Sequence, residues 1–366
     1  MSNPLPTSQI SSFVPTPLFV VGCDRSGTTL LTSIIESRLG LAAPLETHFI
    51  PYFAKTLFLW GNLAQRRNRA TLLTAIYHFL EILVHQNYPN KDRNTLLPAT
   101  LLATRPHAQT ILDQSSNFGE LIGQLFGHFA SIQGKRGWVD NSSFYESIPL
   151  KIWQKHLPDM KVIHMVRDGR DVALSWLQSW WGPASLGEAA QLWSAHVTDK
   201  RRWGAAHPDG YLEVQYETLL NDPDQVLQQI AHFLGLQLEP RNLDWSNSQT
   251  ARILSTGGTH DLLAGPILAT NKEKWRRSMS SVDQMLFEYA VSTTLRSSGY
   301  PLLHHPPGPM QRVTLWFRLH GSSLRRFFSH IYYAKKAKWL VALFLWMVGP
   351  FGKNIIQLLY NQKQEL

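Results

Sequence analysis

The chain has 366 residues and is 44% hydrophobic, enough for one large α/β domain with an appended segment or for two smaller domains. Its net charge of +9 suits an anionic ligand, nucleic acid or an anionic membrane surface. The single cysteine, Cys23, excludes an intrachain disulfide, and no Cys/His spacing resembles a zinc site. We therefore expect a globular cytoplasmic protein that holds no metal.

The first predicted elements are a lead-in, a strand and a helix. Residues 1–17 are rich in proline and serine and lack the features of a signal peptide, which predicts a disordered lead-in. The short apolar run LFVVGC, residues 18–23, predicts a buried parallel strand. The following TTLLTSIIESRLG has helical periodicity and ends at Gly40, a residue type that caps helices.

The stretch LGLAAPL, residues 39–45, predicts a second strand. Glu46, Thr47 and His48 follow it directly, so we expect them at the carboxyl edge of the sheet. From Pro51 onward the pattern is long and helical with no clear strand, which predicts a helical insertion over residues 51–133.

Two further units each combine a strand with a helix. Asp168 is the expected N-cap of the first helix; in the second, Asp222 caps, Pro223 opens and Gly235 closes the helix. Repeated units of this kind predict an α/β fold with three layers, α/β/α, around a mainly parallel sheet. The two units are KVIHMV with DGRDVALSWLQSW, and GYLEVQY with NDPDQVLQQIAHFLGL.

The segment GCDRSGTT between the first strand and its helix is close to a P-loop. Both glycines and Thr29 fit the nucleotide-binding pattern G-x-x-x-x-G-K-[ST], but Thr28 stands where the lysine is expected. Arg25 is the only cation in the loop, while the backbone amides and the helix start still form an anion site. A phosphosulfate needs less charge compensation than a triphosphate with Mg²⁺, so this loop favours a phosphosulfate.

The motif VRDGRDVALS adds a second arginine. It puts Arg167 at the carboxyl end of its strand and Ser175 two turns into the next helix. Since ligands bind at the carboxyl edge of such sheets, we expect Arg167 and Arg25 to approach one crevice. A second phosphate on the ligand would explain the second arginine.

Together these motifs resemble the sulfotransferases that use 3′-phosphoadenosine 5′-phosphosulfate (PAPS), in the style of their bacterial and tyrosylprotein branches. The resemblance covers residues 18–50 and about 138–302, and it implies transfer of a sulfuryl group to a hydroxyl, or an amine, of an acceptor. RSGTTLL looks like the 5′-phosphosulfate loop, and VIHMVRDGRDVALS looks like the 3′-phosphate motif. The implied donor-binding residues are Arg25, Ser26, Gly27, Thr28, Thr29, Arg167 and Ser175, with Tyr216 in VQYETLL on adenine and Lys274 in NKEKWRRSM near the nucleotide.

Attack of a hydroxyl on sulfur needs a general base within hydrogen-bond reach of the acceptor. Glu46 is the first choice, because it would face the loop across the crevice and matches the glutamate of a similar E-T-[RH] stretch in the resembling branch. His48 is the alternative, since imidazole titrates nearest neutral pH. Where many relatives have a lysine, this chain has Asn141, which offers only a neutral hydrogen bond.

The last residues, 303–366, predict a basic and apolar helical extension to a domain of residues 18–302. Within it the apolar run from Trp339 to Phe351 is shorter than the roughly 20 residues that span a bilayer. Two interpretations stay open: residues 331–351 make a peripheral membrane contact, or they form a helix docked on the domain. The acceptor is a small molecule, glycan, lipid or peptide. Two alternative functions are a P-loop kinase and a basic protein that binds membranes or nucleic acid; the leading hypothesis involves no nucleic acid.

Overall fold

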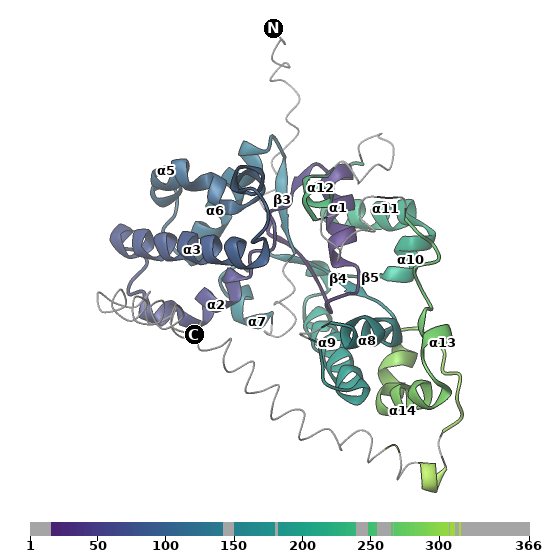
Figure 1. The fold of residues 1–366 in the computed structure, drawn as a ribbon. Coiled ribbons are helices and arrows are strands. Elements are labelled where there is room, and N and C mark those ends of the chain that lie inside the picture. Colours follow the sequence, from purple (N-terminus) through teal and green to yellow (C-terminus); the bar gives the residue numbers. More distant parts are fainter. Residues whose placement is uncertain are drawn as a thin grey trace.

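A computed structural model describes residues 16–141, 150–179, 182–238, 248–254, 265, 267–306, 308–311 and 315. In this part of the chain, five parallel strands form one sheet in the order β2-β3-β1-β4-β5 (Figure 1). This confirms the predicted α/β class and places β1, with the loop that follows it, at the centre. The strands are β1 (Leu18–Gly22), β2 (Leu41–Ala42), β3 (Gly137–Asp140), β4 (Lys161–Val166) and β5 (Tyr211–Gln215).

The strand register brings several predicted functional segments to one edge. β1 pairs with β4 from Leu18 opposite Lys161 to Gly22 opposite Met165. β4 pairs with β5 in the same direction, up to Val166 opposite Gln215. Because all the strands run in parallel, the residues that follow β1, β3, β4 and β5 meet at the carboxyl edge of the sheet.

The two faces of the sheet pack against different helices, because side chains alternate along a strand. In β1, Leu18 and Val20 belong to the core that contains α1 and α11, whereas Phe19 and Val21 belong to the core formed with the helices after β2. Three layers result, as predicted. On the first face lie α1 (Thr28–Arg38), α10 (Tyr216–Asn221) and α11 (Pro223–Leu234).

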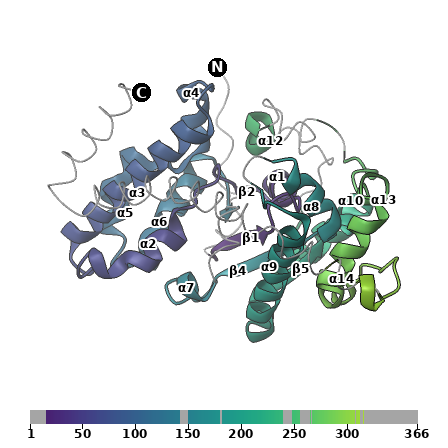
Figure 2. The ribbon, with the colours of Figure 1, turned by 60° about the horizontal axis from the view of Figure 1, so that its bottom comes forward.

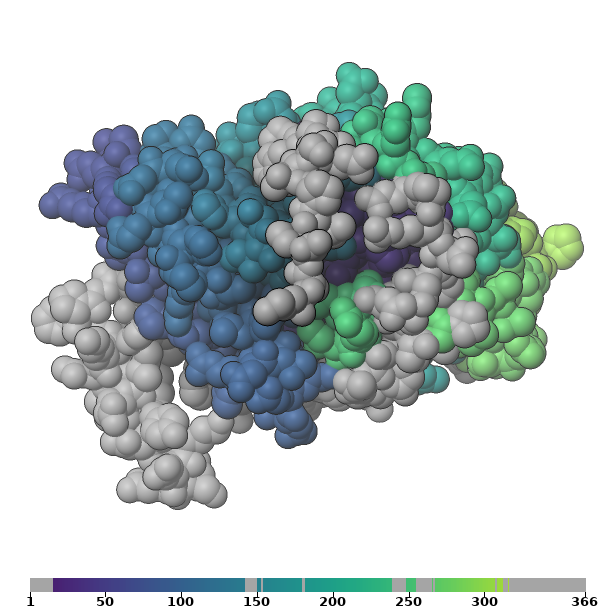
Figure 3. Space-filling view, turned by 90° about the horizontal axis from the view of Figure 1, so that it is seen from above, coloured from purple at the N-terminus to yellow at the C-terminus, as the bar shows by residue number. Residues whose placement is uncertain are grey.

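The chain between β2 and β3 forms the helical segment, residues 49–132, on the other face (Figure 1). Its core is rich in aromatic rings: Phe126 stacks on Trp138 of β3 at 4.2 Å between ring centroids, and Phe49 stacks on Phe126 at 6.3 Å. Figure 3 shows these residues, in blue, on one side of the molecule, with the green residues of the later chain on the other. The α-helices of the segment are α2 (Phe49–Thr56), α3 (Arg66–Asn87), α4 (Arg93–Leu96), α5 (Ala108–Asp113) and α6 (Phe118–Ile132).

A further group of helices packs beside β4, around the buried rings of Trp193, Trp275 and Phe287. Its longest members, α9 and α14, lie next to α8 (Figure 2). The group consists of α8 (Gly169–Leu177), α9 (Leu186–Ala206), α13 (Trp275–Ser278) and α14 (Ser281–Ser297); the short helices α7 (Lys151–Gln154) and α12 (Gln249–Leu254) lie elsewhere.

The expected helix caps are present. Asp168 accepts a hydrogen bond from the amide of Arg170, Asp222 accepts one from the amide of Gln225, and Gly235 closes α11 with a φ of 67°. These signals are local, because each cap bonds within a few residues of itself.

The predicted strands need two corrections: one strand is shorter than predicted, and one was missed. The second strand is limited to Leu41–Ala42 instead of residues 39–45, since Gly40 turns with a φ of 63° and Pro44 follows. β3 was not predicted at all, because four residues are too few to show an alternation. β3 nevertheless lies between β1 and β2, where the sheet decides its conformation.

None of the described helices is both long and apolar enough to cross a bilayer. The predicted membrane or docking segment, residues 331–351, lies outside the described residues, as does most of the extension 303–366.

Candidate functional site

The loop between β1 and α1 has the geometry of an anion site. The amide of Ser26 donates to the carbonyl of Cys23 at 3.0 Å, and α1 begins at Thr28. Thr28 and Thr29 therefore lie at the helix start, where backbone amides lack partners within the helix and the helix dipole favours an anion. The hydroxyl of Ser26 is buried and has no hydrogen-bond partner in the described structure.

Gly27 is required by its surroundings. Its φ of 97° is in the left-handed region, and a Cβ there would come within 2.4 Å of the ring of Tyr216. Tyr216 is the first residue of α10, directly after β5, and its side chain lies against the loop. The predicted adenine-contacting tyrosine and the predicted phosphosulfate loop are therefore in contact.

Arg25 joins the loop to α8. Its Nε donates to the hydroxyl of Ser175 at 2.8 Å, across 150 residues of sequence. Burial lowers the pKa of Arg25, while Asp24 raises it and the charge of Arg167 lowers it further. The loop arginine and the serine of the second motif thus meet, a contact that the sequence did not specify.

Arg167 lies on the other side of this contact. Its Nη1 donates to the carbonyl of Arg25 at 2.9 Å, and its guanidinium carbon is 4.4 Å from the centre of the Tyr216 ring. Its Nη2 is 3.6 Å from the carboxylate of Asp171. Nε of Arg167 is buried without a hydrogen-bond partner among the described residues. The guanidinium groups of Arg25 and Arg167 therefore lie together with the ring of Tyr216, beside the loop at the start of α1.

Asn271 also belongs to this cluster, although the family resemblance singled out only Lys274 in its segment, NKEKWRRSM. Its side-chain Nδ2 donates to the Tyr216 hydroxyl at 2.8 Å, and its carbonyl accepts from Nη2 of Arg167 at 3.2 Å. Lys274, which the resemblance placed near the nucleotide, is exposed just before α13. Its neighbour Trp275 donates its amide to Asp171 at 2.9 Å.

The two predicted bases form one pair. His48 Nε2 lies 2.9 Å from Glu46 Oε2, and the side chains are 6% and 30% exposed, respectively. Thr47, between them, donates its hydroxyl to Asp140 at the end of β3, at 3.0 Å. The helical segment reaches the pair through Tyr88: burial, and secondarily the charge of Glu46, raises the pKa of the Tyr88 phenol. Asn141 follows Asp140 and is buried.

Backbone strain is concentrated at these segments. Among the described residues other than glycine, three have a positive φ: Arg25 at 70°, His48 at 53° and Glu273 at 54°. One is in the loop, one in the predicted base pair, and one two residues after Asn271. Such conformations are unfavourable and cluster at functional sites.

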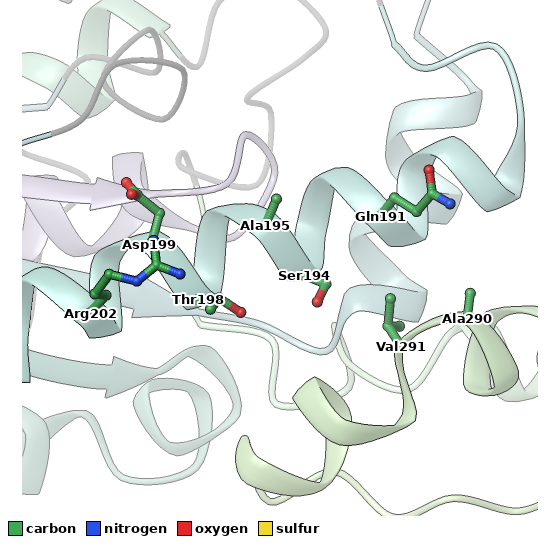
Figure 4. Close-up of a pocket in the computed structure, with 8 residues that line it drawn as sticks. All are labelled: Gln191, Ser194, Ala195, Thr198, Asp199, Arg202, Ala290 and Val291. Atoms are coloured by element: carbon green, nitrogen blue, oxygen red, sulfur yellow. The ribbon is translucent and has the colours of Figure 1, made fainter.

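A shallow groove of about 510 Å³ lies between α9 and α14 (Figure 4). Ser194 and Thr198 of α9 line it together with Val291, where α14 has a non-helical φ of −138°. It contains none of the predicted site residues. Among the described residues, no group of three or more His, Cys, Asp or Glu side chains is placed to hold a metal ion.

With this geometry established, comparison with known proteins identifies the family. A sequence profile described as "Sulfotransferase family" matches residues 17–240. The chain belongs to the sulfotransferase family. A protein of Aquifex aeolicus (strain VF5) described only as uncharacterized is 25% identical over 269 residues, which are 71% of this chain. The chain spans 30% of the length of that relative.

Solved structures show the same fold. The sulfotransferase domain from the Synechococcus PCC 7002 olefin synthase is 21% identical with a TM-score of 0.54, over 80% of this chain and 97% of that one. The sulfotransferase domain from the curacin biosynthetic pathway is 19% identical with a TM-score of 0.54, over 80% of this chain and 100% of that one. Family and fold support sulfuryl transfer as the general chemistry.

Proposed function

We propose that this protein transfers a sulfuryl group from PAPS to a hydroxyl, or an amine, of an acceptor that lies under the helical segment. The cluster of Arg25, Arg167, Ser175 and Tyr216 around the loop carries this proposal. Two guanidinium groups at one helix start suit a donor that is anionic at both its 5′ and its 3′ position. The acceptor is a small molecule, glycan, lipid or peptide.

The residues present fit such a donor. The hydroxyl of Ser26 and Nε of Arg167 are buried polar atoms without hydrogen-bond partners in the described part of the chain. A phosphosulfate and a 3′-phosphate would supply the acceptor atoms that these groups lack. When bound, PAPS supplies the sulfuryl group, and Arg25 with the loop amides stabilises the charge that develops on the departing phosphate. Asn141 offers only a neutral hydrogen bond at the position where the family resemblance implies a lysine.

The Glu46–His48 pair would accept the proton. In the reaction, the acceptor oxygen bonds to sulfur, the bond from sulfur to the bridging phosphate oxygen breaks, and the hydroxyl proton leaves to a base. Glu46 remains our first choice for the base, because its carboxylate is the more exposed member of the pair. His48 would then orient Glu46 through their 2.9 Å contact; the reverse assignment is the alternative.

Calorimetric titration tests the donor site directly. The purified protein, Arg167→Ala and the exposed control Arg66→Ala are each titrated with 3′-phosphoadenosine 5′-phosphate, and separately with ATP and Mg²⁺. We expect metal-independent binding of the bisphosphate by the wild type and the control, weakened at least tenfold in Arg167→Ala, because a charge-assisted contact is lost. Binding of Mg-ATP alone would refute the proposal and support a P-loop kinase.

A further inference from the structure

We call Arg25, Arg167, Ser175 and Tyr216, together with the loop, the donor cluster. The segment from Leu268 to Trp275 contacts this cluster, and it follows the part of the chain that the family profile matches, which ends at residue 240. Hydrogen bonds hold this segment near its beginning and at its end. The amide of Asn271 donates to the carbonyl of Leu268 at 2.8 Å, which forms a turn. The amide of Trp275 donates to Asp171, and the Trp275 ring, fully buried, lies 3.6 Å from the guanidinium carbon of Arg170.

Asn271 holds two members of the cluster by different groups. Its backbone carbonyl accepts from Arg167, and its side-chain amide donates to the hydroxyl of Tyr216. Substitution of the side chain removes only the second contact. Tyr216 is fixed on its remaining sides, since Arg167 covers its ring and Gly27 leaves room for it in the loop. Within the described part of the chain, Asn271 is the hydrogen-bond partner of the Tyr216 hydroxyl, so it controls this end of the side chain.

We propose that Asn271 is a positioning residue for the donor nucleotide, which acts by holding the hydroxyl of Tyr216 and, through it, the ring between Arg167 and the loop. The inference rests on the proposed function, because it assigns the cluster to a nucleotide donor. The left-handed backbone of Glu273, two residues further on, is the strain expected where a turn is held in place for function.

A double-mutant cycle tests this assignment. Affinity for 3′-phosphoadenosine 5′-phosphate is measured for the wild type, Asn271→Ala, Tyr216→Phe and the double variant. Each single change removes the same hydrogen bond, so we expect each to weaken binding about five- to tenfold. The double variant should bind no more weakly than either single variant, since the second substitution then has nothing left to remove.

A matched control uses the same residue type and removes a different contact to the same segment. The side chain of Asn221, at the end of α10, accepts a hydrogen bond from Lys272 and forms no hydrogen bond with Tyr216 or Arg167 in the described structure. Asn221→Ala should bind the nucleotide like the wild type. Urea unfolding of all variants checks that affinity, and not folding, has changed.

Each contrary outcome is distinct. Wild-type affinity in Asn271→Ala would overturn the inference. A second outcome would also overturn it: adding Asn271→Ala to Tyr216→Phe weakens nucleotide affinity as much as Asn271→Ala does in the wild type. Asn271 would then act through the general structure of the segment. Failure of the wild type to bind the nucleotide would refute the proposed function itself, before any variant is compared.

Discussion

The donor cluster and the helical segment are held together by different forces. In the donor cluster, hydrogen bonds and charges join Arg25, Arg167, Ser175, Tyr216 and Asn271, which come from separate parts of the sequence. In the helical segment, aromatic and aliphatic side chains pack on one face of the sheet. Directional contacts fix orientation, whereas apolar packing fixes shape. The proposed donor, an anion with defined charged groups, requires the first, and the proposed acceptor pocket under the helical segment requires only the second.

The largest expected effect concerns the residue pair between these two regions. Glu46→Gln should lower the rate of sulfuryl transfer about 10²- to 10⁴-fold, because it removes the proposed general base, while nucleotide binding persists. His48→Gln should cause a smaller loss. Single-turnover transfer from labelled PAPS to a simple phenol measures both rates, with Glu81→Gln, a carboxylate of the helical segment bound to Arg105, as the control. A larger loss in His48→Gln would make His48 the base.

The stability of the helices beside the donor cluster should depend on a buried charge in α8. Arg170 is fully buried, with its guanidinium 2.8 Å from Asp168 and 2.8 Å from Glu288. Arg170→Met leaves these carboxylates unpaired and should lower the free energy of unfolding by roughly 3–5 kcal/mol in urea titrations. Arg66→Met breaks an exposed pair with Asp113 and should cost less than about 1 kcal/mol. Equal losses in the two variants would contradict this difference.

The helical segment should depend on apolar packing. Leu121→Ala, at a fully buried position of α6, should lower the free energy of unfolding by roughly 2–5 kcal/mol, because it leaves a cavity. Nucleotide affinity of the folded protein should stay unchanged, as measured by calorimetry. Ile132→Ala, at an exposed position of the same helix, is the control. Loss of nucleotide affinity in Leu121→Ala would mean that the two regions are coupled.

The smallest effect is a pH dependence at the β4–β5 side of the sheet. Burial lowers the pKa of His164 below its ordinary 6.5, more than the nearby Glu213 raises it. The unfolded chain therefore binds more protons than the folded chain. The contribution of His164 to the free energy of unfolding is present above pH 6.5 and is lost as the pH falls below that value. The pKa of Glu213 is lowered to about 2, so its own contribution is lost only below its ordinary 4.5.

Urea unfolding between pH 8 and 5.5 isolates the contribution of His164. In His164→Asn the dependence should become shallower, by at most about 1.4 kcal/mol per pH unit for one proton. The exposed control His85→Asn should keep the wild-type dependence. An unchanged slope in His164→Asn would show that another group titrates.

What the sequence by itself determined about this protein is local. The strand, glycine loop and helix of residues 18–40, and the caps at Asp168, Asp222 and Gly235, were predictable, because each depends on neighbours within a few residues. Parallel strands also put Arg25 and Arg167 at one edge without any knowledge of side-chain contacts.

Only the tertiary structure decided which distant residues meet. Asn271 lies 55 residues after Tyr216, and Thr47 lies 93 residues before Asp140; no periodicity or spacing links such pairs. The same holds for β3, which is too short to be recognised by its pattern and is a strand because β1 and β2 flank it. Contacts across long separations depend on how the layers pack, and packing is a property of the whole fold.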